Sequence, residues 1–236
     1  MNEYLKIWQK KPFLRHVYKK RFREIESLLV QGNVLEIGCG NGMLTQHLGK
    51  RCLGVDVDPE SRAKVVTDAG CLALKENSFS NVVAVNVFHH IRHPRQFFNE
   101  ALRILKKDGR LIIVEPYMGF LNHLVFRLFH HELCKKNLKY PAALEENIYH
   151  EVGNYYLGHS FFLNSVAVDK YLKGFSLTGK LITGSVMDLL SGGYNHRQFL
   201  SDDICLALLR IRNRFPDSKF DASRMVLTFT PVTDSD

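Results

Sequence analysis

The chain has 236 residues, of which 45% are hydrophobic and 24% are charged. This length and composition allow one domain with a sizeable core, and they exclude a disordered or low-complexity chain. The sequence holds no apolar run of about 18 residues, and its first residues lack the apolar stretch of a secretory signal, so we expect a soluble, cytoplasmic protein. The five cysteines show no C-x-x-C spacing, which predicts reduced thiols.

The first predicted element is a basic helix over residues 13–31. Residues 1–23 hold eight Lys or Arg residues and one acidic residue, so they carry +7 of the net charge of +8. The pattern predicts a helix that packs on the sheet edge and has a solvated basic face. The alternative is contact with phosphates or an anionic membrane surface. Apolar residues recur close to helical spacing at Leu14, Tyr18, Phe22, Ile25 and Leu29.

The next predicted element, a strand over residues 33–37, runs into a glycine-rich turn. Residues 34–42 read Val-Leu-Glu-Ile-Gly-Cys-Gly-Asn-Gly. Glycines allow backbone conformations closed to other residues and let a ligand approach without meeting a Cβ atom. A dinucleotide-binding turn has the spacing G-x-G-x-x-G and binds a pyrophosphate, whereas here the third glycine comes one residue earlier and Glu36 lies beside the turn. A carboxylate at this place suits a cationic ligand.

Strands and helices then alternate along the chain. This alternation predicts a parallel sheet with helices on both faces, and ligands of such sheets bind at the carboxyl ends of the strands. Glu36, Asp56, Asp68 and Asn86 fall at such ends, so we expect them in one pocket. The predicted elements are helices over 42–50 and 94–107, a short helix after Pro59, and strands over 52–56, 64–67, 81–86 and 110–115.

Residues 36–42 match the pattern E/D-x-G-x-G-x-G at every defined position, and on this motif the chain resembles the class I S-adenosylmethionine-dependent methyltransferases. The resemblance continues in order through residues 53–56, 67–69, 79–91 and 105–116, and it stops near Tyr117. It implies S-adenosylmethionine as the cofactor and methyl transfer as the activity. It also implies an α/β fold with a doubly wound, mostly parallel seven-stranded sheet of Rossmann-like form.

The resemblance further implies which residues bind the cofactor. Asp56, 20 residues after Glu36, stands where the family's second strand ends in an acid that accepts from the ribose hydroxyls. Asp68 stands where a carboxylate accepts from the adenine amine. Two departures, at residues 79–80 and 106–109, affect loop geometry more than cofactor binding. The residues expected at the cofactor are Glu36, Gly38, Cys39, Gly40, Asn41, Asp56, Val57, Asp68, Ala69, Asn86 and Val87.

The second half of the chain should select the acceptor. Residues 118–173 are too many for a simple crossover to a sixth strand, and they predict a helical cap inserted after the fifth strand. A strand over 178–187, a helix over 201–213 and a strand over 224–230 should complete the sheet. We therefore expect one domain in three parts: a cofactor-binding half with the N-terminal helix (1–117), the acceptor cap (118–173), and the C-terminal strands and helix (174–236).

Methyl transfer from a sulfonium requires accurate positioning, and a hydroxyl acceptor also requires a base. Histidine titrates near neutral pH. His130 and His131, in the expected cap, are the predicted catalytic bases, and His89 or His90 is an alternative. A buried structural histidine is the alternative in each case. Adjacent histidines on a helix point about 100° apart and chelate one ion poorly, so we expect no metal site.

The turn after the predicted fourth strand bears on the acceptor. It reads Asn86-Val87-Phe88-His89 and lacks the Asn/Asp-Pro-Pro-aromatic motif with which base methyltransferases hold a flipped base. The predicted function is therefore methylation of a small-molecule, lipid or glycan acceptor, with oxygen as the favoured atom. Segments 129–132 and 190–195 are similar to small bacterial methyltransferases associated with surface-glycan assembly. An RNA-directed methyltransferase and a cofactor-binding scaffold without catalysis are the alternatives, and the oligomeric state stays open.

Overall fold

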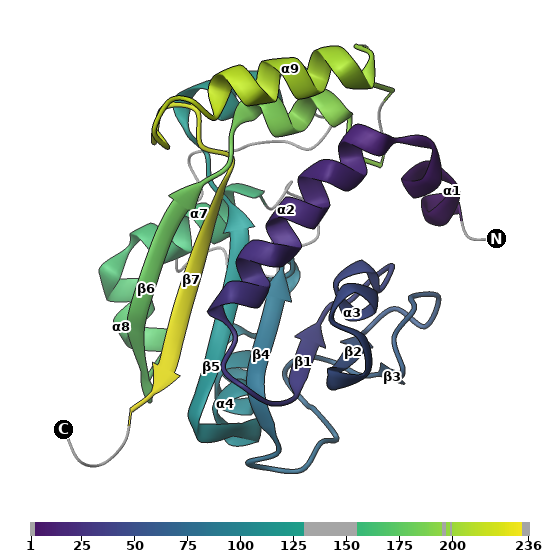
Figure 1. The fold of residues 1–236 in the computed structure, drawn as a ribbon. Coiled ribbons are helices and arrows are strands. Elements are labelled where there is room, and N and C mark those ends of the chain that lie inside the picture. The colour runs from purple at the N-terminus through teal and green to yellow at the C-terminus, as the bar shows by residue number, and fades with distance from the viewer. Residues whose placement is uncertain (1–2, 130–154, 195–196, 199, 233–236) are drawn as a thin grey trace.

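The structure is a computed structural model, and it describes residues 3–129, 155–194, 197–198 and 200–232 (Figure 1). Strands β1, β4 and β5 point toward the end of the molecule at which helix α9 (Asp202–Arg212) lies. Within the described part of the chain, no helix combines the length and the apolar character needed to cross a membrane.

The seven strands form one sheet in the order β3-β2-β1-β4-β5-β7-β6. Strands β1 to β5 pair in parallel, and β7 is antiparallel to both β5 and β6. This confirms the predicted mostly parallel, seven-stranded α/β sheet. The strand bounds are Val34–Ile37 (β1), Cys52–Asp56 (β2), Val65–Val66 (β3), Phe79–Val85 (β4), Leu105–Pro116 (β5), Phe175–Thr183 (β6) and Arg224–Pro231 (β7).

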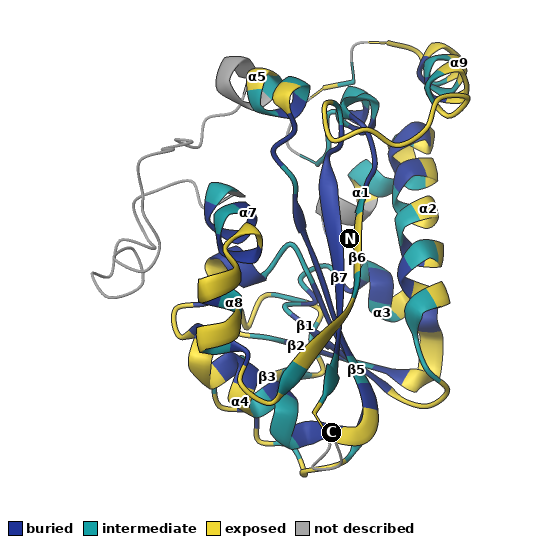
Figure 2. Ribbon diagram, turned by 90° about the vertical axis from the view of Figure 1, so that its left-hand side faces the viewer, coloured by how far each residue is buried: buried dark blue, intermediate teal, exposed yellow. Residues whose placement is uncertain are grey.

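Helices cover both faces of the sheet, as Figure 2 shows. Helices α2 (Pro12–Leu28) and α3 (Met43–Leu48) lie on one face, and α4 (Pro94–Ile104), α7 (Tyr155–Leu163) and α8 (Ser165–Tyr171) lie on the other. The described helices between residues 118 and 173 therefore lie in two different places. Helix α5 (Phe120–Phe129) leaves the carboxyl end of β5, whereas α7 and α8 pack beside α4. The remaining helical segments are α1 (Glu3–Lys10), η1 (Gly49–Arg51), η2 (Phe88–His90) and η4 (Val186–Ser191).

The helix predicted over 94–107 ends at Ile104, because β5 begins at Leu105, ahead of the strand predicted over 110–115. Two further predicted elements differ from the structure. The short helix after Pro59 was wrong: residues 59–64 form a turn and bends, because the Asp58 carboxylate accepts from the Glu60 N–H at 2.8 Å and closes a local turn. The strand predicted over 178–187 ends at Thr183. Gly184 takes a φ of +77°, and the Ser185 hydroxyl then accepts from the Met187 N–H at the start of η4.

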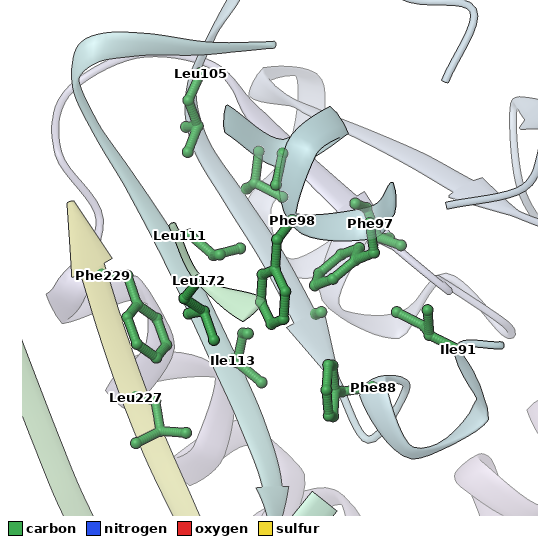
Figure 3. Packing of buried hydrophobic residues seen from close by; sticks show 14 of the residues in the cluster. Phe88, Ile91, Phe97, Phe98, Leu105, Leu111, Ile113, Leu172, Leu227 and Phe229 are labelled. Carbon is green, nitrogen blue, oxygen red and sulfur yellow. The ribbon is translucent and has the colours of Figure 1, made fainter. Parts of the chain in front are cut away.

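The larger hydrophobic core lies between the sheet and the α4–α7–α8 layer (Figure 3). Phe88, in the turn after β4, is 1% exposed, and its ring lies 4.7 Å from the rings of both Phe161 and Phe162. Full burial of such a ring contributes about 1.5–3 kcal/mol. The core thus fixes the turn that follows β4, and this turn carries Asn86 and Val87.

Helix α2 packs along its apolar stripe, as the sequence predicts. Phe13 and Val17 contact Cys205 and Leu209 of α9, and Phe22 and Ile25 join the second core on the sheet. Two cations turn inward here: Lys11, just before α2, donates to the carbonyls of Ser191 and Gly193, and Arg21 of α2 pairs with Asp188. Contact with phosphates or a membrane stays a prediction for the exposed cations Lys19, Lys20 and Arg23.

Candidate cofactor and acceptor site

The glycine turn after β1 is open to a ligand at one position. Gly38 and Gly40 take φ values of +66° and +46°. A Cβ atom at Gly38 would lie 2.3 Å from the Val87 side chain, whereas a Cβ atom at Gly40 would have no protein atom within 4 Å. Glycine at 38 is therefore required by packing, and glycine at 40 borders free space next to the turn.

Asp56 ties the end of β2 to this turn. One of its carboxylate oxygens accepts from the Gly40 N–H at 2.7 Å, and the other accepts from the Asp58 N–H at 3.0 Å. Each carboxylate oxygen has a second lone pair, so Asp56 can still accept from a ligand. Val57, which follows it, is 67% exposed. An acceptor and an exposed apolar side chain therefore lie together beside the glycine turn.

Glu36 is the buried acid of the site. It is 5% exposed, and one of its carboxylate oxygens accepts from the Thr45 hydroxyl at 2.5 Å. Burial raises the pKa of Glu36 from 4.5 to about 7, and the neighbouring Asp56 charge adds to this shift. A cationic ligand near Glu36 would favour its ionised form, as the sequence interpretation requires.

The remaining predicted cofactor residues lie at the same end of the sheet. Asp68 is exposed after β3 and accepts from the Gly70 N–H at 2.7 Å, while Ala69 packs partly against the core. Asn86 takes a φ of +54°, and its N–H donates to the Val114 carbonyl at 2.8 Å. The ends of β1, β2, β3 and β4 thus bring these residues to one edge, and their contact with a cofactor stays a prediction.

A cavity of about 800 Å³ reaches this edge at Asn86. Helix α2, α5, η4 and the ends of β4, β5 and β7 surround it. Most of its lining is apolar, and the residues that α2 supplies include Val17, Phe22 and Ile25. The cavity therefore extends from the predicted cofactor site into the layer beneath the N-terminal helix.

Four charged side chains form one network in the cavity wall. Arg224 donates to Asp188 at 3.0 Å and to Glu24 at 2.5 Å, and Arg21 donates to the same Asp188 oxygen at 3.2 Å. Arg224 is only 5% exposed, so both of its carboxylate partners compensate a buried charge. Two cations and two anions cancel, which leaves this part of the wall without net charge.

Comparison with known proteins finds a family match in the first half of the chain. A family model described as a methyltransferase domain matches residues 35–113, which include β1, the glycine turn, β2, β4 and most of β5. Residues 35–113 carry a methyltransferase domain. S-adenosylmethionine is the cofactor of such domains, and the open space at Gly40, the lone pairs of Asp56 and the buried acid Glu36 fit a cationic ligand with hydroxyl groups.

Relatives of this methyltransferase domain are distant. An uncharacterized protein of Methanocaldococcus jannaschii is 27% identical over 41% of this chain and 51% of its own length. An uncharacterized methyltransferase of Schizosaccharomyces pombe is 24% identical over 37% of this chain and 39% of its own length. The chain thus spans about half, or less, of these relatives.

A solved structure shows the same fold over nearly the whole chain. The crystal structure of a SAM-dependent methyltransferase from Archaeoglobus fulgidus superposes with a TM-score of 0.55 at 16% identity, covering 92% of this chain and 94% of the other. The fold of the methyltransferase domain therefore extends beyond the segment that matches the family model.

The predicted bases cannot be placed, because His130 and His131 lie outside the described residues. Of the alternatives, His89 is 1% exposed, and its Nδ1 lies 2.6 Å from the buried Glu115 carboxylate. This geometry makes His89 a buried partner of Glu115 in the methyltransferase domain. A buried structural histidine is the alternative to a catalytic base that the sequence analysis gave for His89.

Sequence reasoning missed His159, which lies on α7 at the carboxyl end of β5. Its Nδ1 accepts from the Met118 N–H at 3.1 Å, so the neutral ring carries its proton on Nε2. Burial lowers the pKa of His159 to about 4, with the Lys180 charge contributing. A neutral ring whose lone pair is already bonded can donate at Nε2 but is a poor base.

Sequence reasoning also missed Arg21, Glu24 and Asn122 as residues of the cavity wall. A signal for two of them was present, since Arg21 and Glu24 are three residues apart and share one helix face. Asn122 follows two apolar residues at the start of α5, and it is 1% exposed. A buried polar residue at helical spacing with apolar neighbours is a sign of a binding site or a hydrogen-bonded core position.

Proposed function

We propose that this chain transfers the methyl group of S-adenosylmethionine to a small-molecule, lipid or glycan acceptor, with a hydroxyl oxygen as the favoured acceptor atom. The cavity of about 800 Å³ that meets the predicted cofactor site at Asn86 carries the proposal. A pocket of this size matches those that bind drug-sized molecules. Its position places an acceptor next to the cofactor end of the sheet.

The cofactor supplies a methyl group already activated by the sulfonium charge. The residues of this chain then have to hold the acceptor in line, exclude water and receive a proton. An oxygen–methyl bond forms as the sulfur–methyl bond breaks, and the hydroxyl proton leaves to a base. His130 or His131 is proposed for this base, because both follow α5, which lines the cavity through Asn122 and Val125.

The cofactor residues of the proposal come from the strand ends. Asp56 would accept from the ribose hydroxyls, Asp68 from the adenine amine, and Glu36 would face the cationic part of the ligand. The support is the exposed or half-exposed position of the first two and the burial of the third. The other proposed contacts are Gly38, Cys39, Gly40, Asn41, Val57, Ala69, Asn86 and Val87.

Two alternatives to the proposed function predict different experimental results. An RNA-directed methyltransferase needs a positively charged path for phosphates, and the exposed cations of α2 could supply part of it. The four-residue network in the cavity carries no net charge, which supports a small acceptor instead. A scaffold without catalysis would bind the cofactor and release no product.

The test measures release of S-adenosylhomocysteine from S-adenosylmethionine in the presence of sugar, lipid, phenol and RNA acceptor panels. We expect turnover with a hydroxylated acceptor and none with RNA. Turnover with RNA alone would favour the RNA-directed alternative. Calorimetric binding of S-adenosylmethionine without turnover on any panel would favour the scaffold, and absence of binding would contradict the proposed function.

A further inference from the structure

Three residues of the cavity wall each carry a buried polar atom without a hydrogen-bond partner in the described part of the chain: Arg21 Nε, Glu24 Oε1 and Asn122 Oδ1. Buried polar atoms of this kind destabilise the folded chain when they stay unpaired. Their common place in one cavity indicates that a bound molecule supplies the missing partners.

The hydrogen bond of Asn122 fixes which of its side-chain atoms lacks a partner. Its amide nitrogen donates to the Tyr117 carbonyl at 2.7 Å, so the unpartnered atom is the oxygen, an acceptor. The residue is 1% exposed, and water outside the cavity cannot reach it. A ligand that donates a hydrogen bond to this oxygen would satisfy it and would replace any water that does so.

Glu24 and Arg21 extend the pattern along α2. One Glu24 oxygen is engaged by Arg224, and the other is an unpartnered acceptor. One terminal nitrogen of Arg21 donates to Asp188, and its Nε–H is an unpartnered donor. A ligand that satisfies all three atoms must donate to the oxygens of Asn122 and Glu24 and accept from the Nε–H of Arg21. Hydroxyl groups can do both.

The charges and the apolar side chains of the cavity wall further limit the chemical class of the ligand. Arg21 and Arg224 are balanced by Glu24 and Asp188, so a charged ligand would upset a neutral buried network. Arg197 also lines the cavity but is exposed. Much of the lining is apolar and includes Val114, Val125, Met187 and Leu190. A sugar bound here would leave many of its hydroxyl groups without hydrogen-bond partners.

We propose that the cavity binds an uncharged, mostly apolar molecule bearing hydroxyl groups, such as a phenol or a hydroxylated lipid, and that Arg21, Glu24 and Asn122 are its polar contacts. The inference rests on the proposed function, of which it names the acceptor class. It assigns to the basic N-terminal helix the role of an acceptor-pocket wall.

The test is calorimetric binding of three matched probes to the full chain saturated with S-adenosylhomocysteine: 4-octylphenol, 4-octylanisole and 4-octylbenzoate. The first carries a neutral hydroxyl, the second lacks the donor, and the third is an anion. We expect 4-octylphenol to bind about tenfold more tightly than either of the others, which corresponds to one hydrogen bond to a buried charged acceptor.

Glu24→Gln replaces one acceptor oxygen with an amide donor and keeps the side-chain size. We expect it to remove most of the preference for the phenol over the anisole while leaving S-adenosylhomocysteine affinity unchanged. Glu26→Gln is the matched control on the same helix, because Glu26 is exposed and pairs with His47 and Arg51 outside the cavity. We expect this control to keep the preference.

The outcomes separate the two proposals. Failure of S-adenosylhomocysteine to bind contradicts the proposed function itself. Binding of S-adenosylhomocysteine together with equal affinity for the three probes, with tightest binding of the benzoate, or with no probe binding, overturns the acceptor class and leaves the function standing. The probe comparison uses the unmodified chain, so it decides the matter even where the Glu24 variant does not fold.

Discussion

His89 Nδ1 lies 2.6 Å from Glu115 Oε2, and both side chains are almost completely buried. The other Glu115 oxygen accepts from the Phe88 N–H at 3.0 Å, so one carboxylate holds the turn after β4 against the end of β5. A Cβ atom at Gly158 would lie 2.3 Å from this carboxylate, which shows how closely α7 covers it.

Glu115→Ala should lower the free energy of unfolding by about 3–5 kcal/mol, because it leaves a buried histidine and a buried N–H without their acceptor. Urea unfolding followed by circular dichroism measures this loss. Glu26→Ala is the control, since its ion pair with Arg51 is exposed and should contribute about 0–1 kcal/mol. Equal losses of unfolding free energy in the two variants would show that the buried pair stabilises the fold no more than the exposed ion pair does.

The two glycines of the turn after β1 should respond differently to alanine. Gly40→Ala should cost about 1–2 kcal/mol of stability from its positive φ, and it should weaken cofactor binding because its Cβ enters open space. Gly38→Ala should cost about 2–4 kcal/mol, because its Cβ also collides with Val87.

A double-mutant cycle with Val87→Ala separates the two causes. We expect Gly38→Ala with Val87→Ala to lose about 1–2 kcal/mol less than the sum of the single losses, because the smaller side chain removes the collision. Additive losses, measured by urea unfolding, would mean that Val87 does not restrict position 38.

Asp56→Asn should weaken S-adenosylhomocysteine binding by about 1–3 kcal/mol in calorimetry, because it removes the charge of the acceptor that we propose for the ribose hydroxyls and that accepts from the Gly40 N–H. Asp58→Asn is the matched control. Its carboxylate accepts from the Glu60 N–H in the adjoining turn, and its change should leave affinity almost unaltered. The reverse order of effects would assign the ribose to Asp58.

The stability of the cofactor-free chain should fall as the pH rises from about 4.5 to about 7. Burial raises the pKa of Glu36 to about 7, so in this range the folded state binds a proton that the unfolded state releases. The loss should be on the order of 3 kcal/mol. Glu36→Gln lacks this group, so the difference between the unfolding curves of the two chains at pH 4.5 and pH 8 measures it. A pH-independent difference would place Glu36 in contact with solvent.

Removal of a general base should reduce turnover about 10²–10⁴-fold and leave cofactor affinity nearly intact. His130→Ala and His131→Ala, assayed on an acceptor that the panels identify, test the proposed bases separately. Full turnover in both folded variants would mean that the base lies elsewhere or that none is needed.

The strands near the glycine turn and the turn itself could be predicted because their signals are local. Short segments rich in apolar residues reveal β1 and β2, Gly40 follows β1, and Asp56 ends β2. The cavity wall could not be predicted in this way. Glu24 meets Arg224, 200 residues later in the chain, and only the packing of α2 across the sheet brings the two together.

The place of β7 sets a condition on how the sheet can assemble. This strand lies between β5 and β6; it pairs with β5 from Arg224 to Phe229 and with β6 from Arg224 to Pro231. A ribosome must therefore release more than 100 residues after β5, on the order of the span from Pro116 to Arg224, before β5 gains its second neighbour. Until then β5 presents unpaired backbone groups along a buried, apolar strand, the kind of edge that joins other chains. The growing polypeptide is most exposed to aggregation in the interval between the synthesis of β5 and the arrival of its own C-terminal strand.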